Sequence, residues 1–149
     1  MNTRRYIPVL ALVAVAACQP KAEKQEETAA APATPAASVE IVEPAAGATV
    51  TSPVKFVLKA TGIEIAPAAD EREGVGHFHL FVDKDLTAAA DTMPRGVTGI
   101  IHMGNGKSEF TDSTKSIKAG HHRVILVVGD HHHTALTPLH TDTVEFDVK

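Results

Sequence analysis

The stretch PVKFVLKA, residues 53–60, alternates apolar and polar side chains with a period of two. In an extended chain Val54, Phe56 and Leu58 lie on one face, and two lysines lie on the other. This is the pattern of a half-buried β-strand. The run TVEFDV, residues 143–148, repeats the alternation. Both runs are therefore predicted to be strands with one face in a core.

Between them, the runs HFHLFVD (77–83) and RVILVVGD (123–130) are apolar almost without interruption. Such runs indicate central strands that are covered on both faces. Turn-forming residues separate the strands at Pro44–Gly47, Gly104–Gly106 and Ala119–Gly120. About seven short strands in roughly 110 residues predict an all-β fold, an immunoglobulin-like antiparallel β-sandwich.

The first 17 residues have the features of a secretory signal: two arginines, an apolar stretch and small residues. The run VAAC, residues 15–18, resembles the lipobox of bacterial lipoproteins, so we predict a lipoprotein signal peptide at 1–17 and lipidation of Cys18. Position 19 is Gln rather than the Asp typical of inner-membrane retention. We therefore expect an exported protein, anchored to the outer membrane and facing the periplasm.

The segment 18–38 is rich in Ala, Pro, Glu and Lys, and after Cys18 it contains, apart from proline, no apolar side chain larger than Ala. It cannot form a core, so a disordered tether is predicted. The folded domain is predicted at 39–149. Because Cys18 is the only cysteine, the domain has no thiol for a disulfide, a metal ion or catalysis.

Composition argues against two classes of partner. Loss of residues 1–17 removes two of 14 basic residues and none of the 18 acidic ones, which leaves a net charge of −6. Nucleic acid is not an expected partner of such a chain. Tyr6 is the only tyrosine and there is no tryptophan, so the stacking rings of a glycan site are missing as well. The expected partners are the membrane, through Cys18, and a metal ion or a periplasmic protein.

The nine histidines all lie between residues 77 and 140. His77 and His79 are two residues apart, so in a strand both rings project from one face while Phe78 and Leu80 face the core. Two imidazoles placed in this way can converge on one ion. We predict a metal site built from this pair and from three partners at strand ends and loops: His102, His122 and His133.

A nitrogen-rich site without thiolate suits Cu(II) or Zn(II), and these are the candidate cofactors. Affinity should fall as the pH drops through about 6.5, where free imidazole becomes protonated. Met103 would add a soft ligand, or it packs in the core. His131 and His132 are interpreted as a solvated loop.

These motifs resemble an uncharacterised bacterial family of exported, immunoglobulin-like domains, domain of unknown function 4399, over roughly residues 41–148. The match covers GHFHLFVD with His77, His79 and Asp83, HMGNGKSE with His102, Gly104 and Gly106, and AGHHRVILVVGDHHH with Gly120, His122, Asp130 and His133. The chain departs from the family pattern at Phe78, Met103 and Ala135–Leu136, where the family has His, Phe and Pro-His. One potential ligand position is therefore missing. The resemblance implies the fold and export, and no activity.

Three functions remain open at this point. The first is a lipid-anchored metal-binding domain for sequestration or transfer. The second is a cupin-like metalloenzyme using His77, His79 and Asp83, which is not expected because a straight strand puts Asp83 roughly 13 Å from His79. The third is a non-metal, pH-responsive envelope module. From residue 39 onward 10 basic and 15 acidic residues give −5, and nine protonated histidines would reverse that charge to +4.

Overall fold

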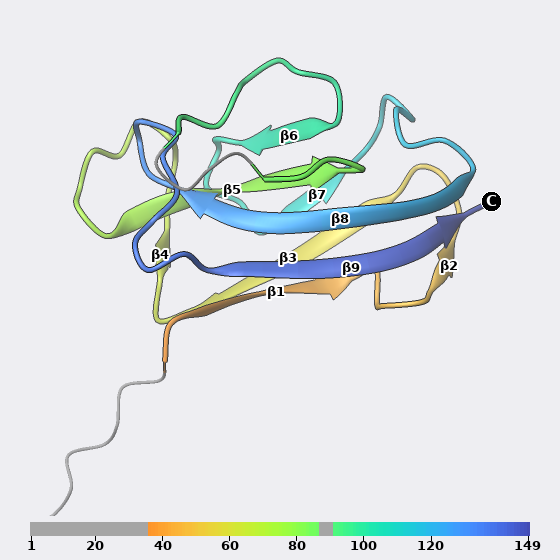
Figure 1. The fold of residues 1–149 in the computed structure, drawn as a ribbon, viewed down its shortest axis with the longest axis horizontal. Coiled ribbons are helices and arrows are strands. Elements are labelled where there is room, and N and C mark those ends of the chain that lie inside the picture. Colours follow the sequence, from red (N-terminus) through yellow and green to blue (C-terminus); the bar gives the residue numbers. More distant parts are fainter. Residues whose placement is uncertain (1–35, 87–90) are drawn as a thin grey trace, which may run out of the picture. The chain divides into compact units, whose positions relative to one another are not determined.

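A computed structural model describes residues 36–86 and 91–149, which form nine β-strands and no helix (Figure 1). The strands are β1 (Ser38–Glu43), β2 (Thr49–Val50), β3 (Lys55–Thr61), β4 (Glu64–Ile65), β5 (Val75–Val82), β6 (Ile100–Met103), β7 (Glu109–Thr111), β8 (Gly120–Gly129) and β9 (Thr141–Val148). The predicted signal peptide, Cys18 and nearly all of the predicted tether lie outside the described residues. Among the residues that the structure describes, no helix has the length and hydropathy needed to cross a membrane.

The strands form two sheets. One has the order β1-β3-β7, and the other has the order β2-β9-β8-β5-β4, with β6 also paired to β5. The longer pairings are antiparallel, whereas β2 with β9 and β4 with β5 pair in parallel over two residues each. The order β1-β3-β7 opposite β9-β8-β5 is that of strands A-B-E opposite G-F-C in an immunoglobulin domain. The predicted all-β sandwich is confirmed.

The main core lies between the two sheets and follows from the alternation in the sequence. Val54, Phe56 and Leu58 of the first predicted strand are all buried, and Phe56 packs edge-on against Phe146 with ring centroids 6.0 Å apart. The alternate residues of β9 are exposed, and those of β3 are exposed or half-buried. Phe78 and Leu80 of β5 are buried in the same core, as predicted. The inward residues of both sheets therefore form one continuous apolar layer.

Strand β5 is also covered on its outer face, because all eight of its residues are buried. On that face Phe81 and Val127 form a second, smaller core with Met93 from the segment between β5 and β6. Ala135, from the segment between β8 and β9, packs against it. The prediction that this run is covered on both faces is confirmed for residues 77–82, whereas Asp83 at its end is exposed. His77 and His79 lie on this outer face, inside the cover.

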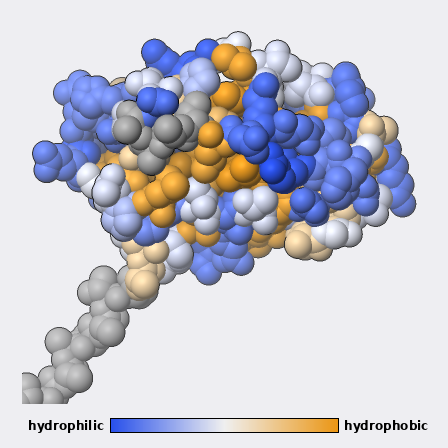
Figure 2. All heavy atoms as spheres, in the orientation of Figure 1, coloured by the Kyte–Doolittle hydropathy of each residue, from blue (hydrophilic) through white to orange (hydrophobic). Residues whose placement is uncertain are grey.

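The remaining surface is mostly polar. Hydrophilic side chains dominate the ends of the face shown in Figure 2, and apolar side chains are visible between them. On the sheet β1-β3-β7, exposed ion pairs join Lys55 to Glu109 at 3.3 Å and Lys59 to Glu40 at 3.7 Å. Exposed ion pairs of this kind contribute little to stability.

Candidate metal centre

The centre begins with the two histidines of β5. The pleat of the strand projects both rings from the outer face, and their ring centroids are 4.7 Å apart. His77 is 1% exposed and His79 is 0% exposed. Full burial of two imidazoles on a strand otherwise made of apolar residues and one glycine is unusual for a residue type of intermediate hydrophobicity. The two rings are therefore polar groups enclosed in an otherwise apolar part of the protein.

His102 is brought to this pair by the register of β6. It lies directly opposite His79 in the antiparallel pairing of β5 and β6, so its ring projects from the same outer face. Its Nε2 atom is 3.1 Å from Nε2 of His77. Because β6 pairs with β5 alone, His102 is part-buried and is the most accessible ring of the cluster.

His133 reaches the same place from the loop after β8. Gly129, at the end of β8, lies opposite His77, and the chain then turns through Asp130 and back to Thr134. The Asp130 carboxylate accepts a hydrogen bond from the Thr134 amide at 2.9 Å and holds this turn. His133 has a left-handed backbone with φ 64°, a conformation that few non-glycine residues adopt. The turn directs its ring inward, with Nε2 3.0 Å from Nε2 of His102.

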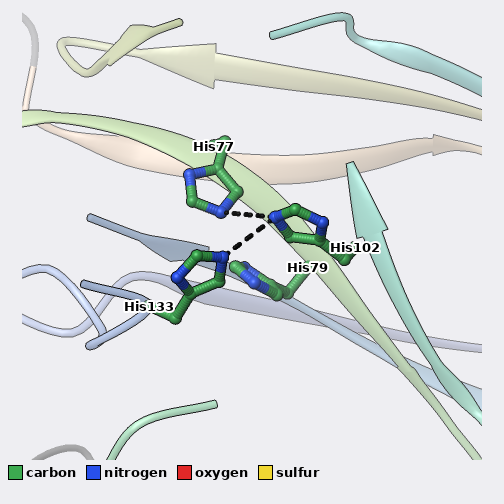
Figure 3. Close-up of side chains that lie close together, drawn as sticks. All are labelled: His77, His79, His102 and His133. Carbon is green, nitrogen blue, oxygen red and sulfur yellow. Dashed lines mark hydrogen bonds between the residues drawn. The ribbon is translucent and has the colours of Figure 1, made fainter. Parts of the chain in front are cut away.

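The four rings surround a common point (Figure 3). All six distances between their centroids fall between 4.7 and 5.5 Å. One ring nitrogen from each residue lies within 4.8 Å of one from every other. Within the described residues this is the group of His, Cys, Asp or Glu side chains placed to hold a metal ion. Four of the five predicted site residues meet here: His77, His79, His102 and His133.

The rings cannot satisfy one another by hydrogen bonds. Nε2 of His102 is near Nε2 of both His77 and His133, yet a neutral ring nitrogen offers either one hydrogen or one lone pair. It can therefore serve only one of the two neighbours. Both nitrogens of His79 are buried with no partner at all. Buried polar atoms without partners are rare and costly, so the cluster has the donor set of a site that takes up a cation.

Burial keeps the rings neutral. Burial, helped by the neighbouring histidines, lowers the pKa of His77 to about 4 and that of His79 to about 3. Burial also lowers the pKa of His102 and of His133, with a smaller contribution from the positive charge of Arg95. Only neutral imidazole has the lone pair that binds a metal ion. The cluster is therefore ready to ligate at neutral pH.

Two glycines that support the centre were not assigned this role from the sequence. A methyl group at Gly129 would overlap the methyl of Met93 and lie 3.0 Å from Cε1 of His79. A methyl group at Gly104 would overlap Cε1 of His102 and lie 2.8 Å from its Nε2. Both glycines therefore leave room for ligand rings. In the sequence, a glycine ending the apolar run 123–129 and one following HM were the available signals.

Met93 is the methionine next to the centre. It is 2% exposed, and its amide donates to the His133 carbonyl at 2.7 Å. Met103, which the sequence offered as a soft ligand or a core residue, lies opposite Phe78 and is buried in the main core. Met103 therefore faces away from the histidines. His131 and His132 lie against each other with tilted rings, their centroids 3.8 Å apart, and His132 is exposed.

His122 does not join the cluster, which corrects the five-residue arrangement predicted from the sequence. It lies on the core side of β8, like Val124 and Leu126, and seven residues, roughly 23 Å of strand, separate it from Gly129. Its Nδ1 is 2.7 Å from Asp83 Oδ2 and its Nε2 is 2.8 Å from the Lys118 carbonyl. Asp83 is therefore paired with His122 rather than with His77 and His79.

Both nitrogens of His122 face acceptors, so the ring donates twice as an imidazolium. Burial opposes this charge, but the hydrogen bonds to Asp83 and to the Lys118 carbonyl outweigh it and raise the pKa of His122. Asp83 also accepts from the Arg123 amide at 3.0 Å, and these bonds lower the pKa of its carboxyl despite burial. The pair joins the end of β5 to the start of β8. Its role in this structure is to hold two strands together.

Replacing His122 by Ala should leave metal affinity unchanged within about twofold, because the side chain lies at the far end of the sheet from the four rings. The same change should lower the free energy of unfolding by about 1–3 kcal/mol, since it removes two hydrogen bonds and leaves the Asp83 carboxylate partly unpaired. Metal titration and urea denaturation of the variant measure the two effects. A large loss of metal affinity would show that His122 is a ligand of the metal site.

Sequence comparison agrees with the motifs. The profile of the family described as Domain of unknown function (DUF4399) matches residues 54–149. The chain belongs to this family. The matched region of the DUF4399 domain contains all four clustered histidines and runs from the end of the β2–β3 connection through β9. A comparison with curated proteins gives no match.

Among solved structures, the chain is similar to an endo-beta-1,4-mannanase from Thermotoga petrophila at 14% sequence identity and a TM-score of 0.44. The alignment covers 76% of this chain and 20% of the mannanase chain, so the DUF4399 protein spans about a fifth of that enzyme's length.

Proposed function

We propose that this DUF4399 domain binds a transition metal ion, copper or zinc, through His77, His79, His102 and His133. The observation that carries the proposal is the convergence of four imidazoles around one point, one of them with both nitrogens buried and unpartnered. A metal ion accepts the lone pairs that the rings cannot give to one another. The ligand set is all nitrogen, which suits copper and zinc.

The spacing of the rings supports this proposal. In a tetrahedral zinc site with bonds of about 2.0–2.1 Å, ligand nitrogens are roughly 3.3 Å from one another. The Nε2 atoms of His102 and its two neighbours are 3.0 and 3.1 Å apart. All the ligating nitrogens lie within 4.8 Å of one another, so binding an ion would draw the more distant rings inward by up to about 1.5 Å. Because two of the ligands lie on a buried strand, little chain ordering opposes binding.

We further propose that the domain works as a lipid-anchored periplasmic protein, held at the outer membrane by Cys18, that sequesters the ion or transfers it to a protein partner. The support is the sequence VAAC followed by a segment rich in Ala, Pro, Glu and Lys. His102, on the edge strand, is the ligand through which an ion would enter and leave.

Replacing Cys18 by Ala should move the protein from the membrane fraction to the soluble fraction, or leave its signal uncleaved. The reason is that the thiol is the point of lipid attachment in the proposed anchor. Fractionation with immunoblotting, together with the N-terminal sequence of the mature wild type, measures this. A wild-type protein that is soluble and begins elsewhere than Cys18 is inconsistent with the anchor.

The metal site is tested by calorimetric titration of the tag-free domain with Zn(II) and Cu(II). We expect one ion per chain with a dissociation constant below about 1 μM, which corresponds to roughly −8 kcal/mol. The double variant His77→Ala/His79→Ala should lose this tight site, because two of the four ligands are gone.

The matched control is His131→Ala/His132→Ala, which also removes two histidines but leaves the four converging rings in place. It should keep the tight site. Equal losses in both double variants, or no binding tighter than micromolar in the wild type, would show that the buried rings do not form the metal site.

A further inference from the structure

The ligand set of the proposed centre carries no charge. It consists of four imidazoles, which bind a metal ion in their neutral form, and no carboxylate or thiolate belongs to the group among the described residues. A divalent ion bound by these rings alone keeps its full charge of +2. A monovalent ion keeps only +1. The choice between them depends on what surrounds the rings.

Three of the four rings are buried beside apolar side chains. His77, His79 and His133 are at most 5% exposed. Next to them on the outer face of β5 lies the small core of Phe81, Val127 and Met93. The cost of moving an ion from water into such a medium rises with the square of its charge, so it is about four times larger for +2 than for +1.

Two exposed or part-buried charged side chains of opposite sign, Arg95 and Asp130, act on the rings of the centre. The positive charge of Arg95 acts on His77, His102 and His133. Asp130 acts in the opposite sense on His77 and His133, and its carboxylate is hydrogen-bonded to the Thr134 amide. Neither side chain belongs to the converging group, so neither neutralises a bound ion by coordinating it.

Met93 adds a soft side chain at the same place. Its methyl group and the His79 ring meet over Gly129, where a Cβ atom would touch both. Its amide is held by the His133 carbonyl at 2.7 Å. Thioethers are polarisable and are favoured by Cu(I) among the ions that also accept imidazole.

From the neutral ligand set, its burial and the adjacent thioether, we propose that the centre selects monovalent copper, Cu(I), over Cu(II) and Zn(II). This inference rests on the proposed metal-binding function and names the ion that the site takes. It departs from the ions that the sequence alone favoured, because an exposed histidine cluster would bind divalent ions by their higher intrinsic affinity. Burial without a counter-charge reverses that order.

The test is a set of competition titrations of the tag-free domain: Cu(I) with a chromophoric Cu(I) chelator under anaerobic reducing conditions, and Cu(II) and Zn(II) with their own chelators in air. We expect Cu(I) to bind at least about 100-fold more tightly than Cu(II), which places the potential of the bound couple roughly 120 mV above that of aqueous copper. His77→Ala/His79→Ala should lose Cu(I) binding.

Arg95→Gln tests the charge argument separately, because Arg95 is exposed and is not a ligand. Removing its positive charge should raise the affinity for both ions. The rise for Cu(II) should be about the square of the rise for Cu(I), because the repulsion scales with the charge of the ion. The control Arg123→Gln removes a guanidinium that pairs with Asp85 at 2.6 Å at the far end of β8, and should change neither affinity.

Two results would overturn the inference. Cu(II) or Zn(II) binding through the same four histidines as tightly as Cu(I), or more tightly, refutes the preference for Cu(I) and leaves the proposed metal-binding function intact. If none of the three ions binds with a dissociation constant below micromolar, both the preference for Cu(I) and the proposed metal-binding function are refuted.

Discussion

Replacing His79 by leucine should stabilise the metal-free domain and abolish its stabilisation by metal. The His79 side chain is fully buried, and neither ring nitrogen has a hydrogen-bond partner. An apolar side chain of similar size removes this desolvation penalty, so we expect a gain of about 1–3 kcal/mol in the free energy of unfolding. Most core substitutions instead lower the free energy of unfolding.

Denaturation in urea with a chelator, and again with excess metal ion, measures both effects. At an ion concentration 100 times the dissociation constant, the wild type should gain about 2.7 kcal/mol, and His79→Leu should gain much less. His122→Leu is the matched control, because that ring makes two hydrogen bonds and its loss should destabilise the domain. Destabilisation of metal-free protein by His79→Leu would mean that the ring has a structural role.

Lowering the pH should destabilise the metal-free domain strongly below about 6.5. The unfolded chain binds protons on its histidines near pH 6.5, whereas the folded pKa is about 4 for His77 and about 3 for His79. Between these values the unfolded state holds more protons, so stability rises with pH and is lost as pH falls from 6.5 towards 4. The two rings together should contribute a loss of a few kcal/mol by pH 5.

His122 acts in the opposite direction. Its raised folded pKa gives stability that is present below 6.5 and is lost as pH rises through the folded value. Urea denaturation of metal-free protein at a series of pH values measures the sum, and His79→Leu should flatten the acid side of the profile. A wild-type stability that is constant from pH 7 to pH 5 would contradict burial of neutral rings.

The same pKa values change the expected pH dependence of metal binding. From the sequence, affinity should begin to fall near pH 6.5, the value for a free imidazole. In the structure, burial lowers the pKa of all four rings, so protons compete with the ion only at lower pH. Affinity should therefore persist below pH 6.5 as long as the domain stays folded.

The strands were predictable because alternation reports directly on burial. Phe56, Phe78 and Phe146 are all at 0% exposure, on the faces that the period of two assigns to the core. Likewise, the uninterrupted apolar run of β5 predicted cover on both faces. The pair His77 and His79 was predictable for the same reason, since residues two apart on a strand share a face.

The partners of that pair depended on features that the sequence does not encode locally. His102 meets His79 because of the register between β5 and β6, and the long segment that joins these strands leaves that register open. His133 reaches the centre from a loop because its own backbone is left-handed. His122 was assigned wrongly, although parity argued against it: it shares a face with Val124 and Leu126, which point into the main core.

Anomalous X-ray diffraction from crystals of the metal-loaded, tag-free domain tests the central claim most directly, because it places the ion and its ligands in one measurement. We predict one strong peak among the four rings, with nitrogens of His77, His79, His102 and His133 at about 2.0–2.1 Å for zinc. A peak at His131 and His132 or at His122, with these four rings still without an ion, would contradict it.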